Sequence, residues 1–140
     1  MTFSQLCVGL IALILLLHVY WALGGQRLLP STIPSDPSTG KTTPEPGRLG
    51  ATLVALVLLH ALFTLGVATQ LWPSPWSLTV TRYSLWIWTG IFLVRVIGDF
   101  RWLGAFKRVR GTAFARADDW LFTPLCATIA LGFTLTLLRL

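Results

Sequence analysis

Charge is scarce in this chain. Only 5 of its 140 residues are acidic, and charged residues make up 11% of the total. No formal charge occurs in residues 1–26, 49–81, 83–94 or 120–138. Globular domains usually carry about 25% charged residues. The composition therefore excludes an ordinary soluble domain.

The residues of most catalytic and metal sites are also sparse. The two cysteines, Cys7 and Cys126, form no C-x-x-C motif and lie in apolar segments, which argues against thiol-redox chemistry and metal binding. The sequence contains no G-x-S-x-G, H-E-x-x-H, P-loop or paired-carboxylate motif. No acidic residue lies in the middle of an apolar run, as a proton-coupled drug exporter would require. We therefore expect no metal and no cofactor.

Long apolar runs are abundant instead. A helix rises about 1.5 Å per residue, so about 20 apolar residues cross a hydrocarbon core of roughly 30 Å. Because a single span must satisfy its own backbone hydrogen bonds, each run is expected to be helical. The sequence predicts an all-α, membrane-embedded four-helix bundle forming one domain, 1–140, with spans at about 3–23, 49–71, 77–97 and 119–139.

The cations predict an orientation. Eight Lys or Arg residues fall in the loops 24–48 and 98–118, whereas the opposite side has only Arg139 and, just inside the third span, Arg82. The positive-inside rule places the cation-rich side in the cytoplasm and both termini outside. We expect a bacterial cytoplasmic (inner) membrane protein. The Pro/Ser/Thr-rich loop 24–48 is expected to be a flexible connector.

Nine of the sixteen charged residues lie between residues 95 and 119. Past Gly98, apolar residues recur near helical spacing, which predicts a basic amphipathic segment in the headgroup plane on the cytoplasmic side. Asp118 and Asp119 are expected to cap the fourth span, which would start near Asp118 and bend near Pro124. Anionic lipid is the expected partner, and nucleic acid is not. The predicted headgroup contacts are Arg101, Lys107, Arg108, Arg110 and Arg116.

A polar site is predicted at the cytoplasmic mouth of the bundle. His18 and Trp21 share one helical face near the end of the first span, and Arg95 lies at a similar depth. Asp99 follows Arg95 by four residues, so an ion pair between them is expected, with simple snorkelling of Arg95 as the alternative. His18 and His60 differ in depth by about six residues, roughly 9 Å, which disfavours a haem held by both. Each histidine is expected to act as interhelical hydrogen-bonding glue, with acid/base catalysis as the alternative.

Small residues predict close helix contacts. Ala51 with Ala55, and Thr128 with Gly132, have small-xxx-small spacing, and Gly9, Gly66 and Gly90 are further candidates. A compact bundle is expected, and a homodimer or another membrane partner is possible on the same grounds.

The segments "HVYWALGG" (18–25) and "RVIGDFRWLGAFKRVRGTAFARADDWLFTPLC" (95–126) resemble a family of small bacterial four-span membrane proteins of unknown function. The resemblance implies an integral inner-membrane protein and carries no activity with it. It strengthens the expectation that His18, Arg95 and Asp99 share one polar site. The positions that match are His18, Trp21, Gly24, Arg95, Gly98, Asp99, Arg101, Gly104, Lys107, Thr112, Phe114, Asp118, Pro124 and Leu125.

Two functional hypotheses follow. The first is a non-enzymatic binding or accessory protein whose polar mouth and basic segment bind anionic lipid or a membrane partner. The second is a small membrane enzyme or carrier for an anionic, lipid-soluble substrate, with His18 as acid/base and Arg95 as the anion ligand. Replacing His18 alone should abolish activity only in the second case.

Overall fold

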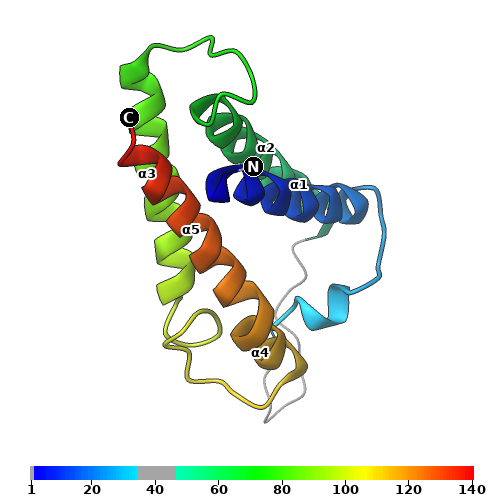
Figure 1. The fold of residues 1–140 in the computed structure, drawn as a ribbon. Coiled ribbons are helices and arrows are strands. Elements are labelled where there is room, and N and C mark those ends of the chain that lie inside the picture. Colours follow the sequence, from blue (N-terminus) through cyan, green and yellow to red (C-terminus); the bar gives the residue numbers. More distant parts are fainter. Residues whose placement is uncertain (1, 35–46) are drawn as a thin grey trace.

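Each of the four apolar runs folds into a helix. A computed structural model describes residues 2–34 and 47–140 (Figure 1). Its long helices are α1 (Phe3–Ala22), α2 (Gly47–Ala68), α3 (Leu78–Ile97) and α5 (Thr123–Leu137). The short helix α4 (Ala113–Ala117) and a π-helical turn, η2 (Asp118–Phe122), lead directly into α5. A 3-10 turn, η1 (Leu29–Ser31), follows α1, and no strand occurs in the described ranges.

Local signals set the helix ends. Thr2 and Gln5 form a capping box at the start of α1, and the Ser77 hydroxyl accepts from the Val80 N–H at the start of α3. The fourth span begins at Ala113 rather than near Asp118, because Thr112 caps it by accepting from the Ala115 N–H. The expectation that Asp118 and Asp119 are the caps was therefore wrong. The wider turn η2 ends two residues before Pro124, which has no N–H to donate.

The helices pack as two pairs. α1 lies along α2, α3 lies along α5, and α1 also crosses α5 (Figure 1). The core between the pairs contains Ile11, Leu65, Leu85 and Phe133, all fully buried. Four helices, namely α1, α2, α3 and the continuous helix 113–137, are long and apolar enough to cross a membrane. Their outward surfaces expose many large apolar side chains, as expected of an integral membrane protein.

The predicted small residue Gly132 allows α1 and α5 to approach closely. Gly132 lies against Cys7, and a Cβ on Gly132 would come within 2.5 Å of the Cys7 Sγ. Beside this contact the Ser4 hydroxyl donates to the Gly132 carbonyl over 3.3 Å. Gly66 is covered by the Trp72 ring. In contrast, a Cβ added at Gly9 or Gly90 would have no atom of the described residues within 4 Å, so neither glycine is needed for a close helix contact there.

His60 connects two helices. Its Nδ1 accepts a hydrogen bond of 3.1 Å from the Trp88 indole N–H, which joins α2 to α3. The ring also lies 5.8 Å from the Trp76 ring. This arrangement matches the interhelical role expected of His60.

The helix ends separate into two groups. Thr2, Ala68 and Thr136 line one hollow, so the start of α1 and the ends of α2 and α5 meet there. At the other end, η1 packs against α4 (Figure 1). The predicted grouping of the loops into two sides agrees with this arrangement.

Candidate functional site

The loop end of the molecule contains an ion cluster with a buried centre, which we define as Arg95, Lys107, Asp118 and Asp119. Asp118 is at its centre, with one carboxylate oxygen 2.5 Å from Arg95 Nη2 and the other 2.9 Å from Lys107 Nζ. Lys107 also pairs with Asp119 and donates to the Gly104 carbonyl over 3.1 Å. Two cations thus face two carboxylates. The side chains of Lys107 and Asp118 are both fully buried, which is tolerable because each charge is paired.

Lys107 therefore does not occupy the position that the sequence predicted for it. It was expected to contact lipid headgroups, but only 2% of the residue is exposed. Burial by itself would lower the pKa of Lys107, but its hydrogen bonds to Asp119 and Asp118 outweigh that effect and raise the pKa. Lys107 is therefore charged throughout the physiological range, and its charge is used inside the protein.

Two glycines close the loop around the cluster. Gly98 and Gly104 both have positive φ, at 87° and 80°. A Cβ on Gly98 would lie 1.8 Å from the Leu103 carbonyl oxygen, and one on Gly104 would lie 2.6 Å from the Gly98 Cα. The Gly104 N–H donates to Asp118 over 2.9 Å. Only residues without a side chain fit here, and the resulting turn brings Lys107 back to Asp118.

Asp99 organises the same turn and does not pair with Arg95. α3 ends at Ile97, so Asp99 is no longer on its helical face. Its Oδ1 accepts from the N–H groups of Arg101, Trp102 and Leu103, at 2.9, 2.7 and 2.9 Å. Slight burial would raise the pKa of Asp99, but these backbone hydrogen bonds prevail and lower it. The predicted Arg95–Asp99 ion pair was wrong, and Asp118 is the partner of Arg95.

The outer surface of this loop is aromatic and basic. Residues 98–112 do not form a regular helix, although their apolar residues recur near helical spacing, because left-handed backbone at Gly98, Phe100, Gly104 and Gly111 interrupts helical geometry. Phe100 and Phe106 are 57% and 62% exposed, with ring centroids 6.3 Å apart. We call this exposed set the aromatic–basic surface. It consists of Phe100, Phe106, Arg101, Arg108, Arg110 and, on α4, Arg116.

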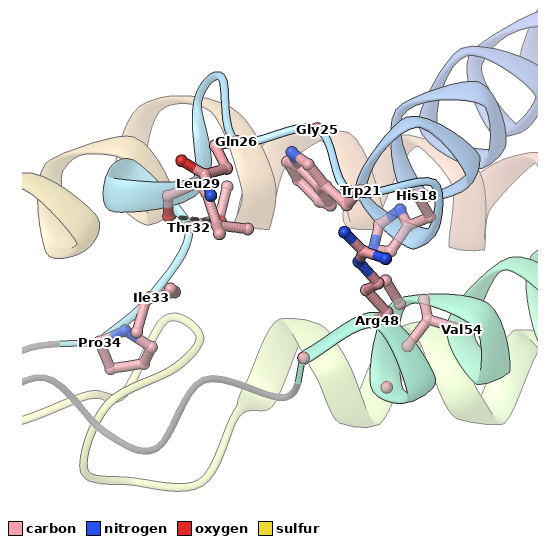
Figure 2. A pocket seen from close by; sticks show the side chains of 14 residues that line it. His18, Trp21, Gly25, Gln26, Leu29, Thr32, Ile33, Pro34, Arg48 and Val54 are labelled. Atoms are coloured by element: carbon pink, nitrogen blue, oxygen red, sulfur yellow. Dashed lines mark hydrogen bonds between the residues drawn. The ribbon is translucent and has the colours of Figure 1, made fainter.

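A separate pocket of about 340 Å³ lies between α1, η1 and the first turns of α2 (Figure 2). His18 and Trp21 line it from α1, with their rings 4.9 Å apart in an edge-to-face arrangement. Arg48 reaches into it from α2 (Figure 2). The rest of the lining is mostly apolar or backbone and includes Leu29, Ile33, Ala51 and Val54.

The chain after α1 is ordered around this pocket, which corrects the expectation of a flexible connector for its first part. The Trp21 indole N–H donates to the Arg27 carbonyl over 2.9 Å, and the Tyr20 hydroxyl accepts from the Arg27 N–H over 3.3 Å. Ile33 is only 6% exposed. These contacts fold residues 24–34 back onto the helix ends. The remainder of the predicted connector, residues 35–46, lies outside the described residues.

The predicted polar site is divided between two places. His18 and Trp21 line the pocket, whereas Arg95 belongs to the ion cluster and Asp99 to the turn beside it. Sequence reasoning missed the central position of Asp118 and the position of Arg48 in the pocket. The proximity of Lys107, Asp118 and Asp119 in the sequence could have indicated the central position of Asp118. Arg48 had no such signal, because it was only one of eight cations on its side.

Comparison with known proteins identifies the family and no more. No curated protein and no solved structure matches the chain significantly. A family model described as "Protein of unknown function (DUF3995)" matches residues 10–133, which include α2 and α3 in full, most of the first and fourth spans, the ion cluster and the lining of the pocket. The chain belongs to this family of proteins of unknown function.

Proposed function

We propose that this chain is a non-enzymatic binding protein of the bacterial cytoplasmic membrane, and that its aromatic–basic surface contacts anionic lipid headgroups from the cytoplasmic side. The termini and the loop 72–76 then lie outside. The orientation is supported by the distribution of Lys and Arg between the two sides.

The observation that carries this proposal is the division of the charges in residues 101–118 between the interior and the surface. Lys107 and Asp118 are buried and neutralise each other, whereas Arg101, Arg108 and Arg110 point outward. Arginine side chains can reach phosphate groups while their apolar stems remain in the interface. Each basic residue near an anionic surface contributes about 1 kcal/mol of attraction.

The exposed phenylalanines favour a membrane surface. Phe100 and Phe106 are close together and largely exposed just past the end of a membrane-spanning helix. In water such a pair would be an unfavourable apolar patch, whereas at the headgroup boundary both rings can be buried. The ion cluster keeps the loop folded so that the rings and the arginines are presented together.

The enzyme or carrier alternative receives less support. It requires His18 and Arg95 to act on one substrate, but Arg95 is paired with Asp118 and is not among the residues that line the His18 pocket. If the lipid experiment described next shows no preference for anionic lipid, the aromatic–basic surface would instead be expected to bind a protein partner, which includes a second copy of this chain.

The proposal is tested by counting retained lipids. The protein is purified in mild detergent with equal amounts of phosphatidylglycerol and phosphatidylcholine, and bound lipids are quantified by native mass spectrometry at low and high salt. Changing Arg101, Arg108 and Arg110 together to Gln should reduce the preference for phosphatidylglycerol several-fold and remove most of its salt dependence.

The matched control removes positive charge from the opposite side. Arg82→Gln combined with Arg139→Gln should leave the preference unchanged, although it also lowers the net charge. An equal effect of the two variants, or no effect of the triple change, would contradict the proposed lipid surface.

A further inference from the structure

The pocket at the end of α1 has the features of a small-molecule site and is distinct from the aromatic–basic surface. Its volume of about 340 Å³ is at the lower end of the range for ligand sites, roughly 300–1,000 Å³. Most of its lining is apolar, and a few polar groups converge on it from α1 and α2. A pocket of this size accommodates a headgroup-sized ligand rather than a whole lipid.

Arg48 supplies a cation to this pocket. Its guanidinium packs so closely against the end of α1 that a Cβ on Gly24 would lie 2.6 Å from Nη2. Gly24 has φ +99° and permits this approach. All three carboxylates of the described ranges contact groups elsewhere, in the ion cluster or the Asp99 turn, and none pairs with Arg48. A guanidinium presents a planar set of N–H donors that matches a phosphate or carboxylate.

His18 supplies a hydrogen-bond acceptor. Its Nδ1 lies 2.9 Å from the Ile14 carbonyl oxygen, which can only accept, so Nδ1 carries the proton in this pair. In the neutral ring Nε2 is then the acceptor. A ligand group with an O–H can donate to it. A ligand that fits both residues therefore has an anionic oxygen for Arg48 and a hydroxyl for His18 in the same headgroup.

The apolar lining gives a place for a hydrocarbon portion. Val54 follows Gly47 by seven residues, so the lining extends about 10 Å along α2 from its first residue. Val54 is 42% exposed, and Leu29 and Ile33 lie on the η1 side of the same pocket. An inorganic anion would leave these contacts unused, whereas an amphiphile can make them.

We infer that the pocket formed by His18, Trp21, Arg48 and Val54 binds one anionic, hydroxyl-bearing phosphate headgroup of an amphiphile such as a phosphoglycerol lipid. Arg48 holds the phosphate, and His18 accepts a hydrogen bond from the hydroxyl. This site does not depend on the proposed lipid surface, because no residue of the aromatic–basic surface lines it.

The test is a titration of the full chain in nonionic detergent, followed by isothermal calorimetry. The probes are dihexanoyl phosphatidylglycerol, dihexanoyl phosphatidylcholine and inorganic phosphate. We expect saturable binding of one phosphatidylglycerol molecule and binding of the other two probes at least about tenfold weaker. Arg48→Gln should weaken phosphatidylglycerol binding about tenfold or more, as expected for a lost hydrogen bond between charged groups.

Arg27→Gln is the matched control. Arg27 lies in the segment between α1 and η1 and is exposed, but it does not line the pocket. This change should therefore leave the affinity for phosphatidylglycerol unchanged. Arg48 is also exposed, and both variants should melt at the wild-type temperature. Equal affinities of Arg48→Gln and wild type would overturn the site.

Three further results would overturn the inference in ways that identify the error. If phosphatidylcholine binds as tightly as phosphatidylglycerol, the pocket does not recognise the net negative charge and the hydroxyl of the headgroup. Inorganic phosphate binding as tightly would show that no amphiphile is required. Loss of binding in the Arg101, Arg108 and Arg110 triple variant would place the ligand on the aromatic–basic surface. Unchanged binding in this variant supports the pocket, whether or not the aromatic–basic surface is found to bind lipid.

Discussion

Asp118→Asn is the sharpest test of how the loop 98–112 is held in place. Asp118 uses both oxygens: one accepts from Arg95, and the other accepts from Lys107 Nζ and the Gly104 N–H. Asparagine has nearly the same shape but only one acceptor atom, and its NH₂ group would face a donor in either orientation. Arg95, which is partly buried, then loses its anionic partner, and the buried Lys107 is left with Asp119 alone.

The expected cost follows from burial. Removing one member of a buried ion pair typically costs about 3–5 kcal/mol, because the remaining charge stays in a low-dielectric site. For a chain of this size, roughly 3 °C is lost per kcal/mol, so we expect the melting temperature to fall by about 10 °C. A thiol-reactive dye can follow unfolding, because Cys7 is fully buried and Cys126 is partly buried.

Asp99→Asn is the matched control. It makes the same chemical change at the start of the loop, but Asp99 uses a single oxygen to accept from backbone N–H groups, which an asparagine carbonyl can replace. We expect it to cost no more than about 0.5 kcal/mol. A double-mutant cycle of Arg95→Gln with Asp118→Asn should show a coupling of about 1 kcal/mol or more. Equal melting temperatures for the two Asn variants, together with additivity in the cycle, would refute the ion cluster as the element that holds the loop.

Three other changes test separate parts of the structure. Gly98→Ala should destabilise the protein by about 3 kcal/mol or more in thermal melts, because its Cβ would collide with backbone, whereas Gly111→Ala, also at positive φ but in open space, should cost only about 1 kcal/mol. Comparable losses would show that the loop relaxes around Gly98. Trp88→Phe removes the donor to His60 and should cost about 1–2 kcal/mol in the same assay; a neutral result would mean that the bond is not formed in detergent. In a cysteine-free background, Ser74→Cys should react with an impermeant thiol reagent on intact cells and Arg108→Cys should not, and the reverse pattern would invert the orientation.

The site was less predictable from sequence than the fold. The pairing of Arg95 with an acidic residue was a sound expectation, but the chosen partner assumed that α3 continues to Asp99, whereas it ends at Ile97. Helical periodicity could not reveal the positive φ of Phe100, which is a local backbone conformation rather than a pattern. Lys107 was classed with the lipid-facing cations because a sequence lists charges without showing which of them lie inside.

The number and helical nature of the spans were determined by the sequence alone, because an uncharged apolar run of about 20 residues in lipid has to satisfy its own backbone hydrogen bonds. The small residues at the crossing of α1 and α5 were readable for a related reason: close approach requires the absence of side-chain volume. Only the tertiary structure decided which charges are buried and which line a pocket. Lys107 meets Asp118 across 11 residues of chain, and Arg48 meets the end of α1 from a different helix. Such contacts depend on how turns and helix ends are placed in three dimensions. That placement results from the whole set of tertiary contacts rather than from any one segment.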